Sequence, residues 1–138
     1  DPSIAVAALG LSPEYFYRDF KTLGFLFESL CIRDLKIYSQ PQNGVMSYYH
    51  DRYGLEADGV LHLEDGRYAL IEFKLGGNEI DKGAEHLCEI ERLIETYNEK
   101  EKQCPLLKPT LKMVITATEY GYRRDDGVLV IPVGCLKH

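Results

Sequence analysis

The sequence is poor in positive charge. Its 138 residues include 16 lysines and arginines against 22 aspartates and glutamates, which gives a formal net charge of −6. Nonspecific affinity for nucleic acids comes mainly from Lys and Arg side chains that displace counterions from phosphates. This balance therefore argues against a broad phosphate-binding surface. It is compatible with a metal-dependent enzyme, because such a site concentrates carboxylates and a partner domain can supply basic surface.

Long apolar runs are also missing. The longest uncharged stretches fall well short of the roughly 20 residues that a membrane-spanning helix needs. No basic start followed by an apolar run suggests a signal peptide. We therefore predict a cytoplasmic protein with no membrane segment. Because the chain opens with Asp1-Pro2 and not with Met, we expect it to be part of a longer protein.

Cysteine is scarce, and linker composition is absent. The four cysteines form no C-x-x-C pair, so neither a structural zinc site nor a disulfide framework is indicated, and buried reduced thiols are expected. No Gly/Ser-rich or Pro-rich tract suggests a linker. The length suits one hydrophobic core, so we predict a single domain over residues 1–138.

The first part of the chain is predicted to be helical. Residues 3–9 form a short Ala-rich helical segment that Gly10 ends. Ser12-Pro13-Glu14 then reads as an N-cap followed by Pro at the first helical position. Apolar residues recur at spacings of three and four over residues 15–38, with Gly24 as the place where this long helix is most easily interrupted.

Extended segments follow the turn at residues 40–44. Residues 45–50, 55–63 and 67–75 read as three strands of an antiparallel meander, and a tight hairpin turn at 64–66 joins the second strand to the third.

A second helix separates these strands from the last two. Asp81 can cap a helix that runs to about residue 102, and residues 111–117 and 128–133 read as strands. The order α-β-β-β-α-β-β predicts an α/β (α+β) fold, with a mixed β-sheet and flanking helices. The helix connection should make the strands at 67–75 and 111–117 parallel.

The third strand carries two charged residues on one face. Period two places Ile71, Phe73 and Leu75 on one side of this strand and sets Glu72 beside Lys74 on the other. An isolated E-x-K of this kind is most often the solvated face of a half-exposed strand.

The second strand adds Glu56 and Asp58 on one face. About the midpoint Asp65 of the predicted hairpin, position 58 reflects onto position 72, so Asp58 and Glu72 are predicted to be cross-strand neighbours. Facing carboxylates repel by up to about 1 kcal/mol, and a cation between them is a physical reason to tolerate the arrangement. Mg²⁺, or Mn²⁺, suits such oxygen ligands.

Glu28 lies in the apolar helical segment 24–30. Its carboxylate either belongs to the same site, pairs with Arg33 or is an ordinary helix-surface charge. The histidines are weaker candidates, because a lone histidine is more often a surface or packing residue than a ligand. His86 and Cys88 are two residues apart on a helix and so point in different directions.

These residues resemble the PD-(D/E)XK nuclease superfamily, which includes restriction enzymes and Holliday-junction resolvases. Asp58 and Glu72-Phe73-Lys74 match its signature, and Glu28 matches its helix glutamate. The resemblance implies a restriction-endonuclease-like core that hydrolyses DNA phosphodiester bonds with Mg²⁺ or Mn²⁺. Asp58, Glu72 and Glu28 would bind the metal, Lys74 would position the attacking water, and Glu56 would support the site from outside.

A closer similarity extends over nearly the whole chain. Blocks at residues 1–3, 24–30, 33–35, 55–58 and 69–77 resemble the uncharacterised C-terminal domain of many bacterial and archaeal AAA-type ATPases. This resemblance implies an ATPase module upstream in the intact protein, and the chain itself has no G-x-x-x-x-G-K-[ST] motif. Two alternatives to a nuclease stay open. One is a catalytically silent module that regulates or contacts the ATPase, and the other is a self-association domain that forms a homo-oligomer.

Overall fold

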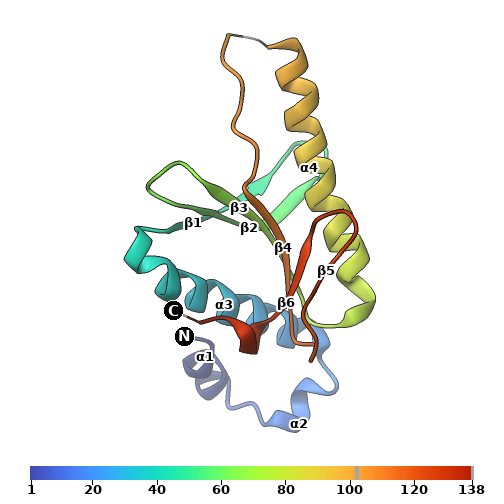
Figure 1. Ribbon diagram of the computed structural model, residues 1–138. Helices are drawn as coiled ribbons and strands as arrows, with labels where there is room; N and C mark the ends of the chain where they lie inside the picture. Colours follow the sequence, from blue (N-terminus) through green and yellow to red (C-terminus); the bar gives the residue numbers. More distant parts are fainter. Residues whose placement is uncertain (102, 138) are drawn as a thin grey trace.

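The computed structural model describes residues 1–101 and 103–137. Six strands form one mixed sheet in the order β1-β2-β3-β4-β6-β5, and the two long helices lie on its opposite faces (Figure 1). The strands are β1 Val45–His50, β2 Glu56–His62, β3 Tyr68–Lys74, β4 Leu111–Thr116, β5 Tyr122–Arg123 and β6 Leu129–Pro132. The helices are α1 Pro2–Leu9, α2 Pro13–Phe16, α3 Phe20–Ser39 and α4 Ile80–Lys100, with short 3-10 turns at Gln40–Gln42, Gly77–Glu79 and Val133–Cys135.

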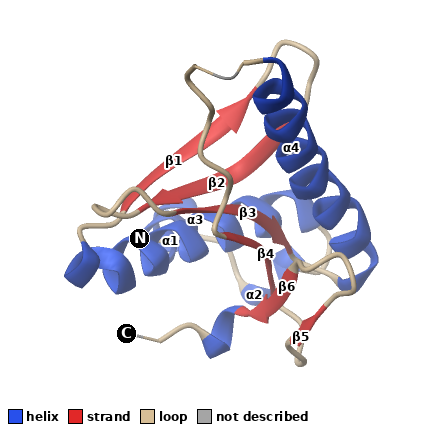
Figure 2. Ribbon diagram, turned by 45° about the horizontal axis from the view of Figure 1, so that its top comes forward, coloured by secondary structure: helices blue, strands red, loops and turns tan. Residues whose placement is uncertain are grey.

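The predicted α+β class with a mixed sheet is confirmed. β1, β2 and β3 form an antiparallel meander, and β3 pairs with β4 in parallel after the crossover through α4. β4 also runs parallel to β6. Figure 2 shows the sheet between α3 on one side and α4 on the other. The three strands predicted before the crossover helix and the two predicted after it are all present.

Period two along β3 divides the core into two halves. Ile71 and Phe73 pack on the α3 face with Phe27 and Cys31, whereas Leu70 packs on the α4 face. Burying an aliphatic side chain of this size contributes about 1.5–3 kcal/mol. The next residue on the α4 face of β3 is a carboxylate, and this position becomes the centre of the site.

The predicted long helix over residues 15–38 is divided, but not at Gly24. The chain leaves helical geometry after α2, and α3 begins where the Asp19 carboxylate accepts the backbone N–H of Thr22 at 3.0 Å. An aspartate that caps a backbone N–H in this way starts a new helix. Gly24 lies within α3, which continues through it.

Two further local predictions differ from the structure. Asp81 does not cap α4: Glu79 is the N-cap residue without a side-chain bond, and Asp81 pairs with Arg124 in the first turn. β5 was not predicted, because a strand of 2 residues is too short to show a period of two. α4 ends at Lys100, and the predicted end at residue 102 lies outside the described residues.

The expectation of buried thiols is only half right. Cys31 is buried and Cys88 half-buried, but Cys104 and Cys135 are exposed, and all four are free. Within residues 1–101 and 103–137, no helix has both the length and the apolar character needed to cross a membrane.

Candidate functional site

The hairpin between β2 and β3 brings the two predicted carboxylates together. In the ladder between β2 and β3, Gly59 pairs with Ile71 and Val60 with Leu70, and this register sets position 58 opposite position 72. The ladder itself ends at the pair Gly59–Ile71, one residue before those two positions. At that end Asp58 Oδ2 accepts the backbone N–H of Phe73 at 2.9 Å. A side-chain carboxylate thus takes the place of a strand carbonyl, and this fixes Asp58 against β3.

Glu72 is the most unusual residue of the sheet. It is 1 % exposed, and neither oxygen of its carboxylate has a hydrogen-bond partner in the part of the chain that the structure describes. Burial raises the pKa of Glu72 to about 7; Lys74 opposes this rise, and the charge of Asp58 adds to it. A buried carboxyl group without hydrogen bonds costs free energy, so its retention in a core strand needs a physical reason.

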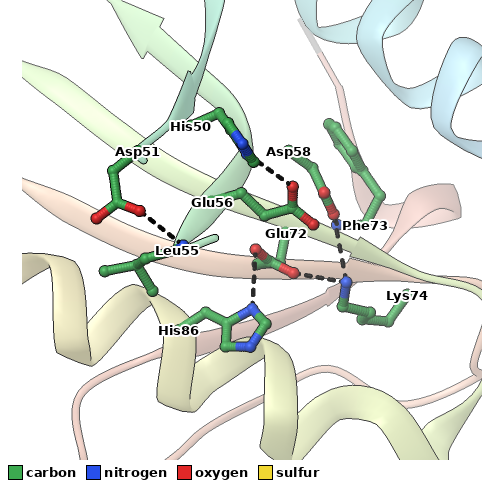
Figure 3. A network of polar contacts seen from close by, with 9 residues as sticks. All are labelled: His50, Asp51, Leu55, Glu56, Asp58, Glu72, Phe73, Lys74 and His86. Carbon is green, nitrogen blue, oxygen red and sulfur yellow. Dashed lines mark hydrogen bonds and ion pairs between the residues drawn. The ribbon is translucent and has the colours of Figure 1, made fainter. Parts of the chain in front are cut away.

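Lys74 lies between the two carboxylates. Its Nζ atom is 2.5 Å from Glu72 Oε2, in an ion pair that lacks hydrogen-bond alignment, and 3.4 Å from Asp58 Oδ2 (Figure 3). Burial tends to lower the pKa of Lys74, but the two carboxylates outweigh burial and raise it. The ammonium therefore stays charged and occupies the position that a cation between Asp58 and Glu72 would take.

Glu28 approaches the same place from α3. With Asp58 and Lys74 it lines an open cleft of about 780 Å³ between α3 and the end of β3. Burial, followed by the charge of Asp58, raises the pKa of Glu28. The alternative pairing with Arg33 is wrong, because Arg33 pairs with Asp1 and Asp34.

Glu56 lies at the outer end of β2. It is exposed and pairs with His50 Nδ1 at 3.3 Å (Figure 3). Its charge still contributes to the raised pKa of Glu72 and of Glu28, as a smaller cause than burial. Glu56 therefore acts on the site through its charge, from the solvent side.

His86 lies at the site, although sequence reasoning ranked the histidines as weaker candidates. Its Nδ1 atom lies 3.7 Å from Glu72 Oε1 and, among the described residues, is buried without a hydrogen-bond partner. The sequence feature that indicates this approach is Gly83, which lies three residues before His86 on the same side of α4. A Cβ atom at Gly83 would lie 3.1 Å from Lys74 Cε and 3.4 Å from Glu72 Cβ, so this glycine lets α4 come close to the site.

The donor atoms fit a divalent cation in part. Mg²⁺ is commonly held by one or two carboxylates, with water and substrate phosphate as its remaining ligands. Asp58 and Glu72 supply two carboxylates, and the buried oxygens of Glu72 lack hydrogen bonds from the described chain. However, no group of three His, Cys, Asp or Glu residues within 1–101 and 103–137 is gathered closely enough to hold an ion. The Lys74 ammonium stands between the two carboxylates instead.

Comparison with known families gave one match. A family described as Domain of unknown function (DUF4143) matches residues 23–136, a range that contains Glu28, Asp58, Glu72, Lys74 and His86. The comparisons with curated proteins and with solved structures found no match.

Proposed function

The chain belongs to the DUF4143 family, and we propose that it is a metal-dependent nuclease domain that hydrolyses DNA phosphodiester bonds. The observation that carries the proposal is Glu72, a carboxylate that is 1 % exposed, lacks hydrogen bonds from the described chain and lies beside Lys74. A strand that is otherwise apolar on both faces keeps these charges at a cost. Binding of a cation and a phosphate would explain why they are retained.

Each residue has a role in the proposal. Asp58 and Glu72 would hold Mg²⁺ or Mn²⁺, and Glu28 would complete the site directly or through water. When bound, the ion would stabilise negative charge that develops on the phosphate and favour deprotonation of water. Lys74 would orient the attacking water and offset the phosphate charge. The hydrogen bond from Phe73 N–H holds Asp58 in place for this role.

The topology supports a restriction-endonuclease-like core. A helix, an antiparallel meander and a helical crossover to a parallel strand are the arrangement that this resemblance implies, and α3, β1–β3, α4 and β4 have it. We further propose that an AAA-type ATPase module lies upstream in the intact protein and controls the domain. We also propose that the domain acts in the cytoplasm.

The test is cleavage of plasmid and branched DNA by the intact protein with Mg²⁺ or Mn²⁺. Glu72→Gln and Lys74→Met should each abolish cleavage. Glu99→Gln, a matched change at the exposed end of α4, should leave it intact. Cleavage that persists equally in all three variants would overturn the proposal.

A second candidate is a catalytically silent module that regulates or contacts the ATPase. It is favoured by the Lys74 ammonium, which already pairs with both Asp58 and Glu72, and by the net charge of −6. Calorimetric titration with Mn²⁺ separates the two candidates. Binding that Glu72→Gln removes supports the nuclease, whereas absence of binding and of cleavage supports the silent module.

A further inference from the structure

We infer that Cys88 and Lys112 form a reversible covalent bond under oxidation: hydrogen peroxide oxidises the Cys88 thiol, and the Lys112 nitrogen then bonds to the oxidised sulfur. The bond would join α4 to β4. The inference does not depend on the proposed function, because it uses residues outside the candidate site and no metal ion.

A cluster of a thiol, an amine and a carboxylate is the first observation. Lys112 Nζ donates a hydrogen bond to Cys88 Sγ at 3.4 Å and lies 2.5 Å from Glu91 Oε2. Cys88 and Glu91 are three residues apart and so lie on one side of α4. Period two along β4 places Lys112 on the same face as the buried Val114, in the core between α4 and the sheet. Regular structure on both sides therefore holds the amine beside the sulfur.

The partial burial of the cluster is the second observation. Cys31 is buried and Cys104 is exposed, whereas Cys88 is half-buried. Reactive cysteines are typically partly exposed and lie beside a cationic group, and Cys88 meets both conditions. The side chain of Lys112 is only 12 % exposed, so it has little room to move away from the sulfur. A pocket of about 320 Å³ that Glu91 and Lys112 help to line opens beside the cluster, so a molecule as small as a peroxide can approach it.

The first chemical step oxidises Cys88. Its sulfur attacks one oxygen of hydrogen peroxide, so that an S–O bond forms and the O–O bond breaks. The second oxygen leaves as water with the thiol proton. The sulfur loses two electrons to the peroxide and becomes a sulfenic acid. A sulfenic acid condenses with a nearby thiol or nitrogen, and the nitrogen in hydrogen-bond contact here is that of Lys112.

The second step uses Glu91 as a base. Burial tends to lower the pKa of Lys112, but its contacts with Glu91 and Cys88 outweigh burial and raise it. The nitrogen is therefore an ammonium in the reduced protein and must lose a proton before it attacks. The Glu91 carboxylate accepts that proton. The nitrogen then bonds to the sulfur of Cys88, the S–O bond breaks, and the hydroxyl group leaves as water with a second proton from the nitrogen.

The experiment treats the intact protein with hydrogen peroxide, alkylates the remaining thiols and maps linked peptides by tandem mass spectrometry. In the wild type, a peptide with Cys88 should be joined to one with Lys112, with the loss of two hydrogen atoms, and dithiothreitol should release it. Lys112→Arg keeps the positive charge but removes the amine, so the link should be absent. The matched control Lys108→Arg changes an exposed lysine that pairs with Glu95, and the link should form as in the wild type.

A disulfide between Cys88 and Cys104 is the main alternative, because Cys104 lies shortly before Lys112 in the sequence and would join neighbouring peptides. The link should therefore persist in Cys104→Ser, and its loss there would overturn the inference.

A second readout is thermal unfolding. Because the bond closes a loop in the unfolded chain, peroxide should raise the midpoint of unfolding of the wild type by about 5 °C or more, and Lys112→Arg should show no such rise. A wild type in which Cys88 stays reduced, or is oxidised without a bond to Lys112, would make the cluster an ordinary ion pair beside a thiol and overturn the inference.

Discussion

At the residue scale, Glu72 controls the electrostatics of the site. Its carboxyl group is surrounded by core on one side and by Asp58, Lys74 and His86 on the other. Burial outweighs the favourable ion pair with Lys74, so the neutral carboxyl is favoured up to a pH near 7. The domain thus keeps a group in β3 whose ionisation opposes folding.

The first prediction concerns the pH dependence of stability. The pKa of Glu72 is raised from 4.5 to about 7 in the folded chain. The stability that the neutral carboxyl group contributes is therefore fully present below the pKa of the unfolded chain, and it is lost as the pH rises through the pKa of the folded chain. In the presence of a chelator, Glu72→Gln should therefore gain about 2.5 kcal/mol relative to the wild type between about pH 5 and about pH 8. Urea unfolding at the two pH values measures this gain. For Glu99→Gln, the difference from the wild type in the free energy of unfolding should be the same at both pH values. The same result for Glu72→Gln would contradict the prediction.

The residues of the site were unequally predictable. Asp58 and Glu72 could be set opposite each other by counting from the hairpin turn, because an antiparallel hairpin fixes its register. His86 could not be placed in this way, since the approach of α4 to β3 depends on packing over the crossover. Only Gly83 carried local information about that approach.

At the element scale, the close contact of α4 with β3 leads to the second prediction. Alanine is favoured over glycine within a helix by about 1 kcal/mol. At Gly83 the added Cβ atom would press on Lys74 Cε at 3.1 Å and Glu72 Cβ at 3.4 Å, whereas at Gly24 of α3 nothing lies within 4 Å. Gly24→Ala should therefore raise the free energy of unfolding by about 0.5–1 kcal/mol. The free energy of unfolding of Gly83→Ala should be about 1 kcal/mol lower than that of Gly24→Ala.

Thermal unfolding and metal titration check this pair of variants together. Because the Lys74 side chain can rotate away, Gly83→Ala should fold but disturb the ion pair between Lys74 and Glu72, which alters ion affinity at the site. Gly24→Ala should leave ion affinity unchanged. Equal stabilisation by both substitutions would show that α4 does not depend on the missing Cβ atom.

The third prediction concerns the apolar stripe that attaches α4 to the sheet. Leu87 is 0 % exposed in the core between α4 and the sheet, whereas Leu93, further along the helix, is 40 % exposed. Leu87→Ala should cost about 2–5 kcal/mol because it leaves a cavity. Leu93→Ala should cost less than about 1 kcal/mol. Chemical denaturation of both variants tests this, and equal losses would place the helix in a different rotation about its axis.

The elements themselves were largely predictable where a period was long enough to count. The apolar periods of α3 and α4 and the extended segments that form β1 to β4 could be read from the sequence, and the structure has them. The boundary between α2 and α3 was missed because apolar residues continue through it, while the Asp19 carboxylate decides where the new helix begins. A single cap can override a periodicity that extends on both sides of it.

At the scale of the whole molecule, net charge limits what the domain can do alone. With a charge of −6, the chain should bind a duplex of about 20 base pairs more weakly than the 10⁻⁴ M typical of weak nonspecific complexes, at about 0.15 M salt. Fluorescence anisotropy with Ca²⁺ in place of an active metal measures the affinity without cleavage. Micromolar binding would contradict this fourth prediction and would reveal a basic surface that the composition does not suggest.

The last prediction asks where DNA lies on the molecule. Glu79 lines the cleft with Glu28, Asp58 and Lys74, whereas Glu99 lies near the far end of α4, and both are exposed. Glu79→Lys and Glu99→Lys change the net charge equally, so their effect on long-range attraction is the same. If a phosphate enters the cleft, Glu79→Lys should tighten DNA binding about threefold or more beyond Glu99→Lys, because only that ammonium lies within contact range. Equal tightening by the two variants would mean that DNA does not enter this cleft.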